Sequence, residues 1–261
     1  MTIVPPSTGP AGQRVLRLGL YLGLLLVATA VLLLALAPFG WRVGWWDYRF
    51  SLLTLMPYAA YTGLAAAIVS ALLLLFARRA IGGRGSAMAL AVLVAGGLVS
   101  YVPWHYRTLA RSVPPIDDIT TDTHNPPAFV ALVPLREAEH SNPSTYAGAK
   151  TAALQKQGYL DIAPLLLTLG PDKAFALALA TAKEMDWTIV ATDRAADRIE
   201  ADQRSFWMGF TDDIVLRVTA SGSGSRVDMR SASRHGRSDL GVNAARVRAY
   251  LARLKMAAGA S

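Results

Sequence analysis

The residues best suited to chemistry lie near the end of the chain, where a strand-like run of alternating polar and apolar residues meets an amphipathic helix. Arginine presents a planar fork of N–H donors that fits phosphate and carboxylate groups. A helix N-terminus adds free backbone N–H groups. This junction therefore predicts an anion-binding site. Its candidate ligands are Arg230, Ser231, Ser233, Arg234, Arg237, Ser238 and Asn243.

The same residue types also build a tied-down turn, which is the alternative interpretation of this junction. In that case Ser238 or Asp239 caps the helix, and Asn243 holds a neighbouring loop. Arg230 or Arg234 would then pair with a carboxylate of the sheet, and an acidic residue at the helix start would compete with a bound anion. The candidate carboxylates are Asp212, Asp213 and Glu200.

Those three carboxylates also carry the enzymatic alternative, because grouped acids serve in acid–base work or in metal binding. Other catalytic signals are missing from the sequence. The four histidines are scattered without ligand spacing, and no Gly-x-Ser-x-Gly elbow is present. The chain contains no cysteine, which excludes thiol nucleophiles and thiolate metal sites. We therefore expect no catalytic residue, no metal and no cofactor.

The elements around the junction predict an α+β domain. Pro171 and Asp172 open a helix that runs to about residue 186, and a last helix is expected over 239–255. Between the two helices, period-two alternation predicts an antiparallel sheet with one buried face, and a Ser–Gly-rich loop at 221–225 predicts a hairpin. The four predicted strands are residues 187–194, 197–204, 212–220 and 226–234.

Three stretches without a charged residue precede this domain and are long enough to cross about 30 Å of hydrocarbon as helices. The predicted transmembrane helices are residues 18–39, 52–76 and 86–104. The full prediction is three N-terminal transmembrane helices followed by a four-stranded antiparallel sheet flanked by helices. We divide the chain into a membrane anchor at 1–104, a proline-rich linker at 105–128 and a water-facing domain at 129–261.

The flanking arginines predict the orientation of the spans. Arg78, Arg79 and Arg84 cluster in one short loop, which is typical of the cytoplasmic side. The N-terminus is then cytoplasmic, and the domain after Trp104 lies in the periplasm of a bacterial inner membrane. The aromatic residues that follow the first span and end the third fall at one membrane interface, in agreement with this pairing of sides.

The charge distribution bears on partners. Residues 1–104 hold seven arginines and one acidic residue, whereas 105–261 hold nineteen basic and seventeen acidic residues. The basic excess therefore borders the spans and indicates membrane topology rather than nucleic-acid binding. The expected partners are the lipid bilayer, an anionic small molecule or lipid headgroup, and an envelope protein; nucleic acid is not expected.

Several motifs also resemble a known family. They are Asp117–Asp122, Asn125–Phe129, Tyr159–Pro164, Ile199–Ala201, Gly209–Ile214 and Arg230–Asn243. Together, over about residues 115–257, they resemble the family known as domain of unknown function 1499, which includes membrane-anchored bacterial members. The resemblance supports the domain assignment and implies no reaction, cofactor or catalytic residue.

These observations favour a non-enzymatic inner-membrane protein whose periplasmic domain binds an anionic ligand or a protein partner. One alternative is an envelope enzyme, hydrolase-like, that uses Asp212, Asp213 or Glu200. Another is a membrane assembly or scaffold protein that acts through its helices.

Overall fold

The computed structural model describes residues 9–259. The chain forms two compact units, Met1–Thr108 and Leu109–Ser261. The first unit is helical throughout its described residues apart from short connections. Its elements are α1 (Pro10–Arg42), α2 (Tyr48–Phe50), the π-helix η1 (Ser51–Leu55), α3 (Met56–Phe76) and α4 (Arg78–Ser112).

Among the described residues of the first unit, three helical segments are long and apolar enough to span a membrane: α1, the continuous run Tyr48–Phe76, and α4. Many of their large apolar side chains are exposed, as expected of helices that face lipid. Inside the unit the helices pack closely at glycine, since a Cβ added at Gly96 would lie 2.5 Å from the Gly63 carbonyl oxygen. These helices support a membrane protein, as the sequence predicted.

The second unit is an antiparallel sheet with helices. Its strands are β1 (Asp118–Thr120), β2 (Leu165–Leu167), β3 (Thr188–Asp193), β4 (Arg198–Arg204), β5 (Thr211–Ser221) and β6 (Gly224–Ser233). The strand order is β1-β6-β5-β4-β3, and β2 pairs with the other end of β6. The helices are α5 (Val133–Ala138), α6 (Ala149–Gly158), α7 (Pro171–Glu184) and α8 (Val242–Gly259).

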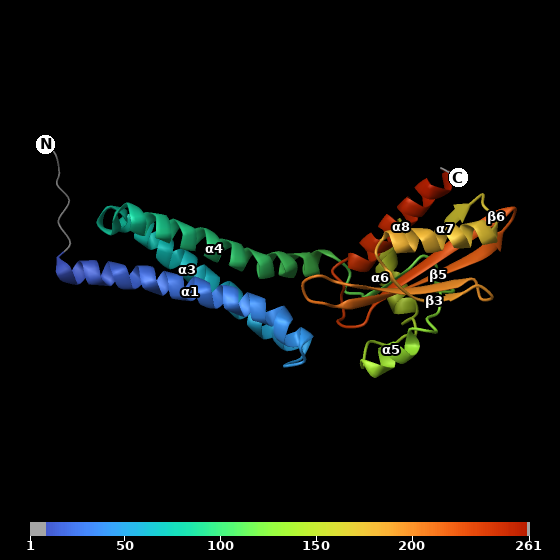
Figure 1. Ribbon diagram of the computed structural model, residues 1–261, viewed down its shortest axis with the longest axis horizontal. Helices are drawn as coiled ribbons and strands as arrows, with labels where there is room; N and C mark the ends of the chain where they lie inside the picture. The colour runs from blue at the N-terminus through green and yellow to red at the C-terminus, as the bar shows by residue number, and fades with distance from the viewer. Residues whose placement is uncertain (1–8, 260–261) are drawn as a thin grey trace. The chain divides into compact units, whose positions relative to one another are not determined.

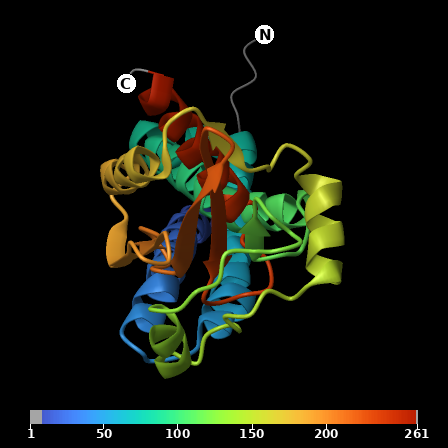
Figure 2. The same ribbon diagram turned by 90° about the vertical axis from the view of Figure 1, so that its right-hand side faces the viewer.

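Helices α7 and α8 lie on one side of the sheet and α5 lies on the other (Figure 1). In the view of Figure 2, β5 and β6 run between α7 and α6. The main core forms between the sheet and the helix pair, where Trp187 stacks on Tyr250 at 4.9 Å between ring centroids. Tyr250 also donates to the Ala178 carbonyl, which joins α8 to α7.

The opposite face of the sheet is also buried, which corrects the expectation of a single buried face. A smaller apolar cluster contains Phe129, Leu132, Val215 and Ala232. It lies beneath residues 121–148, here called the covering segment. Polar side chains alternate with apolar ones on β4, β5 and β6. Beneath the covering segment these polar side chains are held in ion pairs and are not solvated by water. The alternation therefore predicted the strands correctly and the exposure of one face wrongly.

The α+β class is confirmed, but the sheet has six strands instead of four. Strands β1 and β2 were missed because each has three residues, too few to show a period. The chain also differs from the predicted division, since α4 continues to Ser112 and β1 lies among the residues assigned to the linker. Helix α8 begins at Val242 rather than near Asp239, because Leu240 (φ 58°) and Gly241 (φ 83°) take left-handed conformations.

Candidate functional site

The seven predicted anion ligands do not converge on one point. Neighbouring residues on a strand point to opposite faces of a sheet. On β6, Ser231 therefore faces α8, whereas Arg230 faces the covering segment. Ser233 shares the first face, and the Arg234 side chain lies on the second. The remaining residues are Arg237 and Ser238 in the loop after β6, and Asn243 in α8.

Arg230 is buried to 2% exposure and is paired within the fold. Its Nε and Nη2 atoms donate to the two carboxylate oxygens of Asp118, at 2.9 and 2.8 Å. The guanidinium also donates to the carbonyls of Pro127 and Ser144 in the covering segment, and it lies 4.6 Å from the Phe129 ring centroid. Arg230 thus fastens the covering segment to β6.

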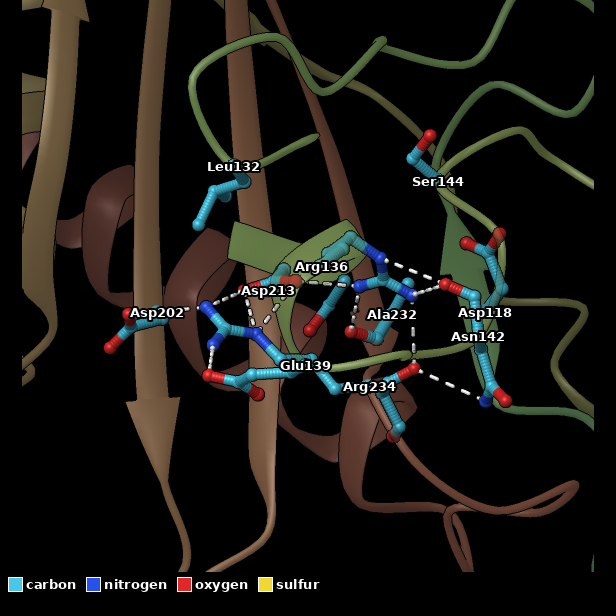
Figure 3. A network of polar contacts seen from close by, with 12 residues as sticks. Asp118, Leu132, Arg136, Glu139, Asn142, Ser144, Asp202, Asp213, Ala232 and Arg234 are labelled. Carbon is cyan, nitrogen blue, oxygen red and sulfur yellow. Dashed lines mark hydrogen bonds and ion pairs between the residues drawn. The ribbon is translucent and has the colours of Figure 1, made fainter. Parts of the chain in front are cut away.

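Two further arginines, Arg136 and Arg234, lie on either side of Asp213 (Figure 3). The Asp213 side chain is fully buried. Arg136 of α5 contacts Asp213 Oδ2 at 2.6 Å, and Arg234 Nη2 contacts Oδ1 at 2.8 Å. Arg136 also donates to the carbonyls of Ala232 and Ser233 at the end of β6. A carboxylate between two guanidinium groups accepts charge-assisted hydrogen bonds from both away from water. This cluster joins α5 to the sheet.

The Asp213 cluster has no surplus of positive charge. Arg234 also pairs with Glu139 at 2.6 Å and lies 3.5 Å from Asp202. Two arginines, Arg136 and Arg234, therefore face three carboxylates. Burial raises the pKa of Asp202, opposed by the charge of Arg234 and assisted by that of Asp213. An added anion would meet net negative charge here, so the cluster is suited to holding structure.

Glu200 is held by backbone groups rather than by the predicted arginines. Its carboxylate, 1% exposed, accepts from the N–H groups of Val130, Ala131 and Leu132 at 2.9–3.0 Å. Arg198 adds an ion pair at 3.0 Å. These three amides precede α5, where a negative charge is favourable. Glu200 thus anchors the start of α5 to β4.

The other face of β6 carries a hydrogen-bonded group centred on Asn243. Ser231 donates to Asn243 Oδ1 at 2.6 Å, and Asn243 Nδ2 donates to Ser233 Oγ at 3.0 Å and to the Asp117 carbonyl at 2.9 Å. Arg246 of α8 is only 8% exposed and contacts Asp212 at 2.7 Å. The interpretation of Asn243 as a loop tie is confirmed.

The loop between β6 and α8, residues 234–241, retains one exposed cation of the predicted set. Asp239 caps the start of α8, because its carboxylate accepts from the N–H groups of Gly241 at 2.8 Å and Asn243 at 2.6 Å. Gly236, at φ 95°, provides the turn. Arg237 is exposed and Ser238 is half-buried.

This loop is bonded to the segment through which the chain enters the domain. Ser233 N donates to the Asp117 carbonyl at 2.9 Å, and Asp239 N donates to the Ile116 carbonyl at 3.2 Å. Helix α4 ends at Ser112, so only residues 113–117, here called the entry segment, separate its last residue from β1. Arg237 therefore belongs to the end of the domain that follows the last candidate span.

Asp117 of the entry segment is an unusual acid. Burial raises its pKa to about 6, opposed by the hydrogen bond from Asn142 and assisted by the charges of Asp118 and Asp239. The Asn142 amide donates to Asp117 Oδ2 at 2.6 Å and to the Gly236 carbonyl at 2.7 Å. Asn142 thus joins the covering segment, the entry segment and the loop 234–241.

Asp117→Asn is expected to stabilise the protein at pH 8 and to have little effect at pH 4. The folded pKa of about 6 exceeds the value of 3.8 for an ordinary aspartate. The stability conferred by protonated Asp117 is therefore present below pH 4 and is lost as the pH rises through 6. Asparagine keeps the acceptor and removes the charge, for a gain of about 2 kcal/mol at pH 8 after allowing for partial exposure.

Thermal unfolding of the full chain in nanodiscs, followed from pH 4 to pH 8 for wild type and Asp117→Asn, measures this difference. Asp172→Asn is the matched control, because Asp172 is an exposed aspartate of α7. A constant difference between wild type and Asp117→Asn across the pH range would contradict a raised pKa.

The comparisons with known proteins assign the domain. A family model described as protein of unknown function (DUF1499) matches residues 118–254, more than half of the chain. The chain belongs to the DUF1499 family. The match begins at β1 and ends within α8, so the family region includes the sheet, the covering segment and the Asn243 group. A comparison with curated proteins gave no significant match.

Sequence reasoning missed four residues that organise the site. Asp118, Arg136, Glu139 and Asn142 precede their partners by about 90 residues or more in most of these contacts. A single sequence carries no signal for pairings at that separation. The separation of Arg230 from Ser231, in contrast, follows from the period-two pattern of β6, so the sequence did contain the information that these residues could not share one ligand.

Proposed function

We propose that this DUF1499 protein is a membrane-anchored binding protein whose domain contacts anionic lipid headgroups through the loop 234–241. The observation that carries the proposal is the pair of backbone hydrogen bonds from Ser233 and Asp239 to the entry segment. They bind the loop to Ile116 and Asp117, which follow the last residue of α4 by four and five residues in the sequence. The phosphate groups of lipids are the anions available at that place.

Arg237 is the side chain proposed to meet the headgroup. It is exposed, whereas Arg230 and Arg234 are 2% and 4% exposed and already form ion pairs with carboxylates of the domain. A basic residue near an anionic membrane surface contributes about 1 kcal/mol of attraction. Ser238, next to it, supplies a hydroxyl. The predicted anion site is thereby reduced to Arg237 and Ser238, with the other five residues holding the surrounding fold.

The proposed location is the periplasmic face of a bacterial inner membrane, with the N-terminus in the cytoplasm. The cluster of Arg78, Arg79 and Arg84 near the start of α4 supports this orientation. A reporter that is active only in the periplasm, fused after Ser261, is expected to be active. An active cytoplasmic reporter at the same position would reverse the orientation.

Headgroup binding is tested by hydrogen exchange of residues 234–241 in the full chain. Nanodiscs of phosphatidylglycerol are compared with nanodiscs of phosphatidylcholine. We expect slower exchange in the anionic lipid for wild type and no lipid-dependent difference for Arg237→Gln. The control is Arg253→Gln, which removes an exposed arginine of α8 eleven residues beyond the helix start, about 16 Å along its axis. Equal exchange of wild type in the two lipids would contradict the proposal.

A protein partner is the second candidate. Val130 and Leu135 of the covering segment are large apolar side chains that are 51% and 42% exposed, and exposed apolar groups serve in protein contacts.

An enzymatic role for Asp212, Asp213 or Glu200 has less support, because each carboxylate contacts an arginine. An assembly role of the helices predicts that co-purifying proteins survive deletion of residues 115–261.

A further inference from the structure

The hairpin loop that joins β4 to β5, residues 205–210, exposes an aromatic side chain on a rigid support. Phe206 is 96% exposed, whereas Met208 two residues later is buried. The loop is closed by the hydrogen bonds from Ser205 N to the Phe210 carbonyl at 2.8 Å and from Phe210 N to Ser205 Oγ at 2.9 Å. Phe206 is therefore presented to the surroundings by an ordered loop.

The aromatic hairpin lies at the end of the sheet where the chain enters. Arg234 N donates to the Thr211 carbonyl at 3.0 Å, and Ser233 N donates to the Asp117 carbonyl. The start of β5, the end of β6 and the entry segment therefore lie side by side. The β5–β6 turn, in contrast, lies at the far end of an eleven-residue strand, about 33 Å away at 3.3 Å per residue.

The tether to the membrane is short. The last span is expected to leave the hydrocarbon at Trp104, and α4 continues for eight residues to Ser112, which adds about 12 Å. The entry segment can add at most about 20 Å if fully extended. It is also shorter than that limit, because Ile116 N donates to the Pro114 carbonyl. Thirteen residues, 105–117, therefore connect the predicted end of the last span to β1.

A second exposed apolar side chain borders the same entry segment. Leu160 is 85% exposed. Gly158, two residues before it, packs against Pro114 so closely that an added Cβ would lie 2.2 Å from the proline ring. Tyr159, its immediate neighbour, lies beside Gly241, the residue before α8. Phe206 and Leu160 are thus exposed apolar side chains that could contact an apolar surface such as that of a bilayer.

We propose that Phe206 inserts into the lipid interface of the membrane that holds the three spans, so that the aromatic hairpin docks the domain on the bilayer. Phenylalanine, like tryptophan and leucine, is found on the apolar face of membrane-surface segments, where it is buried at the boundary between headgroups and hydrocarbon. Burial of a phenylalanine side chain away from water stabilises such contact in a domain that is already tethered. The proposal shares with headgroup binding the assumption that this end faces the bilayer, but it requires no anionic lipid.

A spin label at position 206 tests the insertion. The chain has no cysteine, so Phe206→Cys gives a single labelling site in the full-length protein. In phosphatidylcholine liposomes at low protein-to-lipid ratio, we expect the label to collide with dissolved oxygen, which concentrates in lipid, more than with a water-soluble nickel complex. The matched control is Ser223→Cys in the exposed β5–β6 turn, where the opposite ratio is expected.

Two results would overturn the proposal. A label at 206 as accessible to the nickel complex as the label at 223 means that the hairpin stays in water. A label at 206 shielded from both reagents means that protein covers it. The two proposals can fail separately. If the label at 206 inserts in phosphatidylcholine, and if Arg237→Gln shows the same lipid-dependent hydrogen exchange as wild type, headgroup binding by Arg237 is contradicted and docking by the hairpin is supported.

Discussion

Replacing Asp213 with asparagine is expected to lower the free energy of unfolding by about 3–5 kcal/mol, because it removes the carboxylate that pairs with the buried Arg136 guanidinium. Arg136 and Arg234 are 3% and 4% exposed, and both donate to this one fully buried carboxylate. Asparagine has nearly the same shape but is neutral, and its amide N–H₂ would face a guanidinium group. Domains are commonly stable by only 5–15 kcal/mol, so the covering segment should separate from the sheet.

The control for this substitution is Asp161→Asn. Asp161 pairs with Arg248, but both side chains are largely exposed, and such pairs contribute between 0 and about 1 kcal/mol. Chemical unfolding of the two full-chain variants in nanodiscs gives the comparison. Equal stability of Asp213→Asn and Asp161→Asn would show that the cluster of Arg136 and Arg234 does not hold the fold.

Replacing Glu200 with alanine is expected to lower the free energy of unfolding by about 3 kcal/mol. It should also free residues 130–132 of the covering segment from the sheet. The substitution removes the acceptor of three backbone N–H groups, at Val130, Ala131 and Leu132. The hydrogen bond from Leu132 is buried and the other two are partly buried, and a donor left without a partner away from water is costly. These amides are held by a side chain and not by a regular ladder. Their hydrogen exchange should therefore accelerate more than that of amides in β5.

Glu184→Ala is the control, because Glu184 is an exposed acid of α7 that pairs with exposed Arg253 at 3.3 Å. It should leave the exchange of residues 130–132 unchanged. If Glu200→Ala lowered protection evenly over the whole domain, the covering segment would unfold with the sheet and not as a separate part.

The elements with a regular pattern were predictable. Strands β3 to β6 follow from period-two alternation and from the glycines of the β5–β6 turn, and α7 follows from Pro171 and Asp172 at its start. The first turn of α8 was placed too early because Asp239 has the composition of a helix start. Its side chain indeed caps the helix, but Leu240 and Gly241 intervene in left-handed conformations.

The candidate site was predictable only in its local part. The capping role of Asp239 depends on neighbouring residues, and the structure confirms it. The ion pair of Arg234 with Asp213 was one of the stated alternatives and is also confirmed. Arg230 pairs instead with Asp118, which no local pattern indicates. Glu200 binds backbone N–H groups, which have no signature in sequence.

The proposed division of roles between Arg234, which holds the fold, and Arg237, which contacts headgroups, is tested most directly by one measurement. The unfolding midpoint of the full chain is compared in phosphatidylcholine and phosphatidylglycerol nanodiscs, because a ligand that binds the folded state raises the midpoint. Arg237→Gln should match wild type in phosphatidylcholine and gain nothing in phosphatidylglycerol. Arg234→Gln should unfold earlier in both lipids and keep the gain. An Arg234→Gln protein with the wild-type midpoint in phosphatidylcholine and no gain in phosphatidylglycerol would contradict this division and place the anion site at the buried arginines.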